Sequence, residues 1–173
     1  MLIREALNFA KHELYKLNIK SYSIDSELLL CYVLKKERSN ILINQDNKKI
    51  DYLQYIRFKD LIEQRKKRKP VSQIVGKKYF WKSSFYVNKF TLIPRPETEH
   101  LIELSLKNLN INKKNIILDI GTGSGCIIIS LLTEIKGSKG VAIDVCKEAL
   151  NVAKYNAKMH HFENRIKFFK SSV

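Results

Sequence analysis

The sequence predicts an α/β protein with a helical N-terminal domain, a β-hairpin linker and part of an open, doubly wound parallel sheet. Three observations predict this fold. Apolar residues recur at helical spacing through residues 1–69. Aromatic and β-branched residues replace that pattern in residues 70–93. From residue 94 to residue 173, strand-like and helix-like segments alternate, which is typical of a parallel sheet covered by helices.

The helical domain is expected to begin with two helices. Leucine, isoleucine and alanine recur at three- and four-residue spacing over residues 2–17, which predicts an amphipathic helix facing a core. Ser23 is expected to cap a second helix, because serine oxygens accept hydrogen bonds from the first turn. The apolar run Leu28–Leu34 would form the middle of that helix.

A longer helix over residues 48–67 is expected to complete the domain, after a short apolar segment at Ile41–Ile43. Pro70 would end it, because proline cannot continue a helical hydrogen-bond ladder. The cationic run Arg65–Lys69 is expected to be a solvated helix end that suits the C-terminal dipole. An acidic protein surface or RNA phosphate is the alternative partner for this run.

The linker is predicted to be a hairpin in which Ser83 and Ser84 form the turn between "KKYFW" and "FYV". Pro96 then suits the first position of a helix that continues to about Asn108. Glu97, in the first turn, would complement the positive end of that helix dipole.

The remaining chain alternates between apolar runs and amphipathic segments, which predicts a parallel sheet. Strands are expected at residues 116–120, 140–144 and 165–169, with helices at residues 124–134 and 146–159. The second helix has a narrow face of small or apolar residues suited to lying on a sheet: Cys146, Ala149, Leu150, Ala153 and Ala157.

A glycine loop follows the first of these strands. It consists of Gly121, Thr122, Gly123, Ser124 and Gly125. Such a loop would place free backbone N–H groups and a helix N-terminus at the carboxyl edge of the sheet, where open α/β folds bind ligands. Asp144 ends the next strand and is well placed to accept hydrogen bonds from ribose hydroxyls.

The loop matches neither common nucleotide fingerprint. Cys126 occupies the position where the dinucleotide motif needs Gly or Ala, and the Gly-Lys-Ser/Thr of a P-loop is absent. The arrangement instead resembles the S-adenosyl-L-methionine loop of methyltransferases, which implies that Asp119 lies near the methionine end of the cofactor. Two alternatives stay open: the glycines serve only strand-to-helix packing, and Asp144 only caps the following helix.

The amino-acid composition indicates which classes of partner and ligand the protein can have. The chain of 173 residues carries a net charge of +15, which favours an acidic partner, although Lys, Asn and Ile are frequent throughout. Cys31, Cys126 and Cys146 have no paired spacing and form no ligand pattern with histidine, so no metal is expected. The sequence has no signal-peptide core and no apolar run of about 20 residues, so we expect a cytoplasmic protein without a membrane partner.

The chain as a whole resembles the release factor glutamine methyltransferase family, PrmC or HemK. The resemblance rests on "FWKSSFYVNKFTLIPRPETEHLIE", "ILDIGTGSGCIIISLL" and "VAIDVCKEALNVAKYNAK", and "LIPRPETE" (Leu92–Glu99) is its most specific part. It implies that residues 94–173 are the first half of a Rossmann-like, class I methyltransferase domain. It also implies that residues 1–69 help to dock a substrate protein.

The resemblance further implies the reaction. Members of the family transfer a methyl group from S-adenosyl-L-methionine to the side-chain amide nitrogen of glutamine, in the Gly-Gly-Gln motif of class 1 peptide chain release factors. The residues implied to contact the cofactor are Gly121–Gly125 and Asp144. Nucleic acid is retained as a less favoured partner.

One family motif is absent. The family carries Asn-Pro-Pro-Tyr after a fourth strand, whereas all prolines of this chain (Pro70, Pro94 and Pro96) precede the glycine loop, so no catalytic residue is assigned. Ser172 and Val173 stand where the family usually has an acid followed by an aromatic residue. We therefore expect a truncated form of a longer enzyme, with the strand at residues 116–120 left as an apolar edge.

Two further functions remain alternatives to glutamine methylation. One is an N6-adenine methyltransferase acting on nucleic acid, because that chemistry faces a similarly delocalised nitrogen and the positive charge suits phosphate. The other is a catalytically inactive remnant that binds release factors through residues 1–69.

Overall fold

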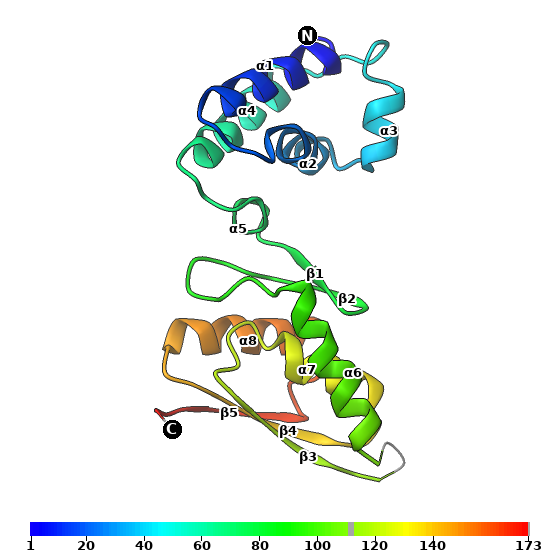
Figure 1. Cartoon of the computed structure of the whole chain (residues 1–173), viewed down its shortest axis with the longest axis vertical. Coiled ribbons are helices and arrows are strands. Elements are labelled where there is room, and N and C mark those ends of the chain that lie inside the picture. The colour runs from blue at the N-terminus through cyan, green and yellow to red at the C-terminus, as the bar shows by residue number, and fades with distance from the viewer. Residues whose placement is uncertain (111–112, 173) are drawn as a thin grey trace. The chain divides into compact units, whose positions relative to one another are not determined.

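The computed structural model describes residues 1–110 and 113–172 (Figure 1). They divide into two compact units, Met1–Val75 and Gly76–Val173. Each unit has its own buried apolar cluster, one containing Phe58 and the other containing Phe85. Val173, at which the sequence suggests a departure from the family pattern, lies outside the described residues.

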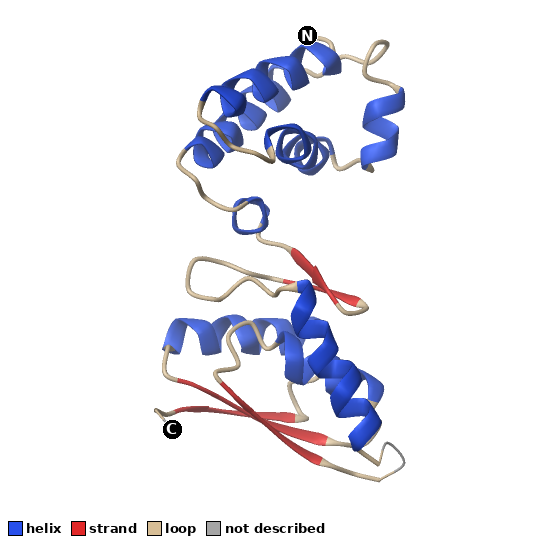
Figure 2. Cartoon of the chain, in the orientation of Figure 1, coloured by secondary structure: helices blue, strands red, loops and turns tan. Residues whose placement is uncertain are grey.

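Helices build the first unit (Figure 2). The small side chains Ala6 and Ala10 are fully buried on one face of the first helix, where they let neighbouring helices approach closely. Phe58 fills the same core and is also fully buried. The helices are α1 (Ile3–Lys16), α2 (Tyr22–Leu34), α3 (Arg38–Ile43), α4 (Tyr52–Lys66) and α5 (Val71–Val75).

Two predicted helix starts are wrong. The N-cap of α2 is Ser21, whereas Ser23 lies inside the first turn and donates its hydroxyl to Glu27 Oε1 at 3.2 Å. Helix α4 begins later than residue 48, because Asp51 and Gln54 form a reciprocal cap. Asp51 Oδ1 accepts from the Gln54 N–H at 2.7 Å, and Gln54 Oε1 accepts from the Asp51 N–H at 3.1 Å.

The cationic run Arg65–Lys69 is only partly the solvated helix end that the sequence suggests: its last three residues are exposed, whereas its first two are held in ion pairs. Arg65 Nε lies 2.8 Å from Asp25 Oδ2, and both side chains are largely buried. Lys66 Nζ lies 2.9 Å from Glu13 Oε2. These ion pairs fasten the end of α4 to α2 and α1, so Arg65 and Lys66 have a structural role.

Glu27 of α2 is a second buried anchor. Its side chain is only 6% exposed and lies 2.9 Å from Lys11 Nζ and 2.7 Å from Arg38 Nε. Burial raises the pKa of this carboxyl, but the hydrogen bonds from Lys11 and Arg38 outweigh burial, so the pKa lies below its ordinary value. The stabilisation is therefore present above the unfolded-state pKa and is lost as the pH falls through the folded-state pKa.

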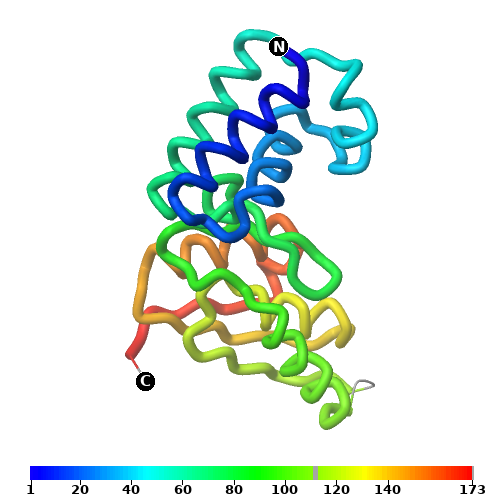
Figure 3. Tube along the Cα trace, turned by 45° about the horizontal axis from the view of Figure 1, so that its top comes forward, coloured from blue at the N-terminus to red at the C-terminus, as the bar shows by residue number. Residues whose placement is uncertain are grey.

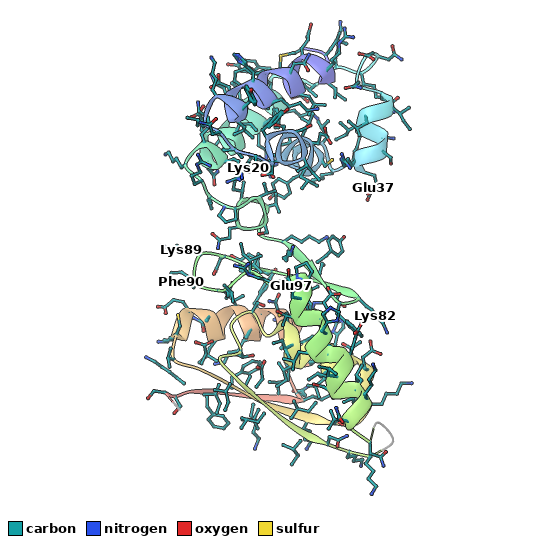
Figure 4. The ribbon with its side chains drawn as sticks, in the orientation of Figure 1. Lys20, Glu37, Lys82, Lys89, Phe90 and Glu97 are labelled. Carbon is teal, nitrogen blue, oxygen red and sulfur yellow. The ribbon has the colours of Figure 1, made fainter. Side chains whose placement is uncertain are left out.

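We expect Glu27→Gln to lower the free energy of unfolding by about 2 kcal/mol near neutral pH, because charge-assisted hydrogen bonds are lost. The difference from the unmodified chain should shrink below the ordinary glutamate pKa of 4.5. Urea unfolding of the whole chain, once near neutral pH and once below pH 4.5, measures the free energy of unfolding of each variant. Glu37→Gln, at an exposed acid before α3 (Figure 4), is the control and should change stability by less than about 0.5 kcal/mol. Equal effects of the two substitutions would contradict the prediction.

The second unit contains an antiparallel hairpin followed by alternating strands and helices. Its hairpin consists of β1 (Lys78–Phe80) and β2 (Ser83–Phe85). The other elements are η1 (Pro96–Thr98), α6 (Glu99–Asn108), β3 (Ile116–Ile120), α7 (Cys126–Glu134), β4 (Lys139–Asp144), α8 (Lys147–Met159) and β5 (Ile166–Lys170). The predicted helix at Pro96 therefore begins with a turn of 3-10 helix before α6.

The hairpin turn lies at Trp81 and Lys82, so the prediction of a turn at Ser83 and Ser84 is wrong. Trp81 adopts a left-handed backbone with φ of 55°. Its N–H donates to Glu99 Oε1 at 2.9 Å, and its indole Nε1 donates to Glu134 Oε1 at 2.7 Å. Contacts with α6 and α7 therefore hold the turn in a conformation that a bulky side chain rarely adopts.

The predicted parallel sheet is confirmed. Its order is β3-β4-β5, with both neighbouring pairs parallel (Figures 1 and 3). In the register, Asp119 is paired with Ala142, and Ala142 with Phe168. This pairing brings the carboxyl ends of β3 and β4 side by side, which places the glycine loop next to Asp144.

Helices α7 and α8 lie on one face of this sheet (Figure 2). Ala142 points into that face and is fully buried. On the alternate positions of β3, by contrast, Ile116, Leu118 and Ile120 are 83%, 57% and 56% exposed. Strand β3 is thus an edge strand of the described sheet with an open apolar face, as the sequence pattern suggests.

Candidate functional site

The glycine loop connects β3 to α7 at the carboxyl edge of the sheet. The N–H groups of Gly121 and Thr122 donate to the Ile143 carbonyl at 2.8 and 3.0 Å, and the Gly125 N–H donates to the Thr122 carbonyl at 2.8 Å. The Gly123 N–H donates to Asp144 Oδ2 at 2.9 Å. The expectation of free N–H groups at these four positions is therefore wrong, because neighbouring acceptors within the unit already bind them.

The three glycines of the loop have different surroundings. All adopt the left-handed region, with φ of 74°, 55° and 77° for Gly121, Gly123 and Gly125. A β-carbon added to Gly121 would have no neighbour within 4 Å, and one added to Gly123 would meet only a loop carbonyl at 3.9 Å. A β-carbon on Gly125 would lie 3.2 Å from Ala153 Cβ of α8. The first two glycines border open space, whereas Gly125 is packed on α8.

Asp144 stands beside the loop and is shared between two backbone groups. Besides its bond from Gly123, it accepts the Cys146 N–H on Oδ1 at 2.9 Å. The N-cap residue of α8 is Cys146, so Asp144 does not itself cap the helix. A carboxylate has about four lone-pair sites, so each oxygen keeps capacity for another donor. The two hydrogen bonds from the backbone fix the orientation of the carboxylate and leave it able to accept further hydrogen bonds.

Asp119 occupies the end of β3 under the same loop. Its Oδ2 accepts the Thr122 hydroxyl at 2.8 Å. Burial raises the pKa of Asp119 above its ordinary value, the Thr122 hydrogen bond opposes that rise, and the negative charge of Asp144 adds to it. Asp119 thus orients the Thr122 side chain inside the loop.

Asn156 of α8 also belongs to this site, and the sequence analysis missed it. Its side chain is fully buried, and its Nδ2 donates to the Ser124 carbonyl at 2.8 Å. The signal available in the sequence was a polar residue between Ala153 and Ala157, on the face of α8 that the alanines mark as buried.

The segment Leu92–Glu99 leads from the loop after β2 through η1 into the first residue of α6. Pro94 is buried, whereas Arg95 and Glu97 are exposed (Figure 4 labels Glu97). Glu99 holds the hairpin turn through the Trp81 N–H. The motif therefore has a structural end at Glu99 and an accessible middle.

A cavity of about 500 Å³ lies between the loop that follows β2 and one side of α8. Aromatic rings form much of its wall, and Tyr86 and Tyr155 meet edge to face with their centroids 5.2 Å apart. Lys89 Nζ lies 5.0 Å from the centre of the neighbouring Phe90 ring (Figure 4). The lining residues are Tyr86, Asn88, Phe90, Glu148, Asn151, Val152 and Tyr155.

Two other kinds of site are absent from residues 1–110 and 113–172. No helix there is long and apolar enough to cross a bilayer. In the same residues, no group of at least three His, Cys, Asp or Glu side chains could hold a metal ion.

Comparison with known proteins gives two matching family models. Residues 5–76 match the PrmC N-terminal domain, and residues 111–173 match a methyltransferase domain. The release factor glutamine methyltransferase of Nitratidesulfovibrio vulgaris is 36% identical over 95% of this chain and 55% of its own length. The protein of the same name from Buchnera aphidicola is 40% identical over 95% of this chain and 58% of its own length.

Solved structures give weaker similarity. An RNA methyltransferase from Salinibacter ruber, in complex with S-adenosyl-L-homocysteine, is 23% identical, with a TM-score of 0.39. The match covers 47% of this chain and 50% of that protein.

The parallel sheet and its glycine loop define the second unit as a class I methyltransferase domain, of which the described strands form the first half. The first unit resembles the PrmC N-terminal domain. The chain is similar to the curated release factor glutamine methyltransferases along most of its own length and spans about half the length of these relatives.

The two ends of the glycine loop should respond differently to the same substitution. Gly121→Ala is expected to cost about 1 kcal/mol, from the left-handed backbone alone. Gly125→Ala should cost about 3 kcal/mol, because crowding against Ala153 adds to the same backbone strain. Denaturant unfolding of both variants measures the difference. A Gly121→Ala variant as unstable as Gly125→Ala would contradict the packing difference.

Proposed function

We propose that this chain binds S-adenosyl-L-methionine at the glycine loop and Asp144, and serves methylation of the glutamine side-chain amide in the Gly-Gly-Gln motif of class 1 peptide chain release factors. The open space beside Gly121 and Gly123, next to a fixed carboxylate, carries the proposal. The names of the relatives support the choice of substrate.

The loop residues fit the proposed cofactor. The glycines allow a ligand to approach the backbone to within van der Waals contact, because no β-carbon intervenes. The residues proposed to contact the cofactor are Gly121, Thr122, Gly123, Ser124, Gly125 and Asp144. The free lone pairs of Asp144 suit the hydroxyls of a ribose. Because the N–H groups of Gly121, Thr122, Gly123 and Gly125 are already bound within the chain, the loop is shaped before the ligand arrives, which lowers the entropic cost of binding.

Amide methylation requires accurate placement of the reacting groups. The amide nitrogen is a weak nucleophile because its lone pair is delocalised into the carbonyl, so alignment with the methyl donor supplies much of the catalysis. The cofactor supplies an electrophilic methyl group bound to a sulfonium. The described residues bind and orient it. No residue of this chain is assigned to activate the amide.

The helical first unit is the proposed docking region for the release factor. Its Arg65 and Lys66 are engaged in ion pairs within the unit, which makes them poor phosphate ligands. For these two residues the observation favours a structural role over phosphate binding, whereas Lys67, Arg68 and Lys69 are exposed. Methylation of adenine in RNA or DNA, with salt-dependent binding, would favour the nucleic-acid alternative.

The activity is tested by incubating the purified chain with S-adenosyl-L-methionine and a class 1 release factor, and locating any methyl group by peptide mass spectrometry. We expect one methyl on the glutamine of Gly-Gly-Gln and none on a release factor with Gly-Gly-Ala. A methyl group elsewhere would contradict the substrate. Absence of transfer despite cofactor binding would restrict this chain to cofactor binding, and the activity proposal would fail.

Asp144→Asn is expected to weaken binding of S-adenosyl-L-homocysteine at least about tenfold, because the amide carries fewer acceptor sites and turns a donor toward a backbone N–H. Isothermal titration calorimetry measures the dissociation constant. Glu163→Gln makes the same charge change at an exposed residue of this unit and should leave the affinity unchanged. Equal affinities for the Asp144→Asn variant and the unmodified chain would remove Asp144 from the proposed site.

A further inference from the structure

Asn156 is a fully buried polar side chain whose three hydrogen bonds all go to backbone groups. Its Oδ1 accepts the Tyr86 N–H at 2.8 Å. Its Nδ2 donates to the Tyr86 carbonyl at 2.9 Å and to the Ser124 carbonyl at 2.8 Å. Leaving such an amide or its partners unpaired in the interior is costly, so these bonds determine what the position tolerates.

Only a primary amide of this length satisfies all three partners. The reversed amide would turn Oδ1 toward two carbonyl oxygens, so the partners themselves fix the orientation of the side chain. A carboxylate would likewise face the carbonyls of Tyr86 and Ser124. Leucine has a similar volume but would leave the Tyr86 N–H and the carbonyls of Tyr86 and Ser124 without a hydrogen-bond partner. The contacts therefore select asparagine by its chemistry as well as by its size.

The partners of Asn156 belong to two segments that are far apart in the sequence. Ser124 lies in the glycine loop, one residue before Gly125, which packs on Ala153 of the same helix. Tyr86 follows β2 and begins the segment that leads to the accessible residues of "LIPRPETE". One face of α8 therefore holds the cofactor loop and the start of the motif segment together.

We propose that Asn156 is a positioning residue that holds the Ser124 peptide of the glycine loop in its binding-competent shape and couples that loop to the segment starting at Tyr86. It acts through the loop and does not itself touch the ligand. The identity of the ligand, S-adenosyl-L-methionine, rests on the proposed function. The coupling of the two segments rests only on the contacts of Asn156.

The test compares Asn156→Leu with Leu150→Ala in the whole chain. Leu150 is a buried residue of the same helix, at 4% exposure, so its truncation destabilises α8 while leaving the Asn156 side chain in place. Urea unfolding first establishes how far each variant loses stability. Calorimetry then gives the dissociation constant for S-adenosyl-L-homocysteine, and amide hydrogen exchange reports on the N–H groups of Tyr86 and Gly125 under conditions where each variant is folded.

We expect Asn156→Leu to weaken S-adenosyl-L-homocysteine binding about tenfold or more. It should also speed exchange at both Tyr86 and Gly125. Leu150→Ala should leave binding within about twofold at comparable stability. Asn156→Gln keeps the amide but moves it by one methylene. It should fully restore neither the affinity for S-adenosyl-L-homocysteine nor the protection of the two N–H groups from exchange. Equal binding and exchange in Asn156→Leu and Leu150→Ala would overturn the proposal.

The two proposals fail in different ways. If the unmodified chain does not bind S-adenosyl-L-homocysteine, the cofactor assignment fails, and hydrogen exchange alone decides whether Asn156 couples the segments. If the unmodified chain binds and Asn156→Leu binds equally well with unchanged exchange, the cofactor assignment stands and the positioning role is wrong. If Asn156→Leu does not fold at any temperature tested, exchange in Asn156→Gln decides, and protection equal to the unmodified chain refutes the coupling.

Discussion

The close approach of the glycine loop to helix α8 is the constraint on which the rest of the second unit depends. Gly125 can lie on Ala153 only because neither position carries a larger side chain. That approach brings Ser124 within reach of Asn156. It also brings the loop N–H of Gly123 to Asp144 at the end of the neighbouring strand. A larger residue at either side of the contact would separate the loop from all of these partners.

The site is organised by bonds within the protein, which changes how it can recognise a ligand. A loop that offers unpaired N–H groups binds anions such as phosphate. In this loop the N–H groups of Gly121, Thr122, Gly123 and Gly125 already have acceptors. A ligand can use the open space over two glycines and the remaining lone pairs of Asp144. Such a surface suits a ligand that is held by shape and hydroxyl groups better than a phosphate.

Local patterns predicted much of this fold, and long-range contacts account for what they missed. The strands and α8 have clear apolar periodicity, and the glycine loop is recognisable because it joins a strand to a helix. The turn at Trp81 depends on Glu99 and Glu134, which lie far along the chain. Likewise, the burial of Arg65 depends on Asp25, and no local pattern shows that partner. A register, a cap or an ion pair of this kind appears only when the chain has folded.

The exposed apolar face of β3 and the candidate site lie on opposite sides of the sheet, because side chains alternate along a strand. Successive side chains of a strand point to opposite faces of the sheet, so Asp119 points away from the face that exposes Leu118 and Ile120. Asp144 follows the same alternation from Ala142, the residue paired with Asp119, so both acids belong to the helix-covered side. This shared side explains why the charge of Asp144 contributes to raising the pKa of Asp119. The groups that form hydrogen bonds with the loop thus lie on the helix-covered side of the sheet or at the ends of the strands. The exposed apolar side chains of β3 form none of these bonds.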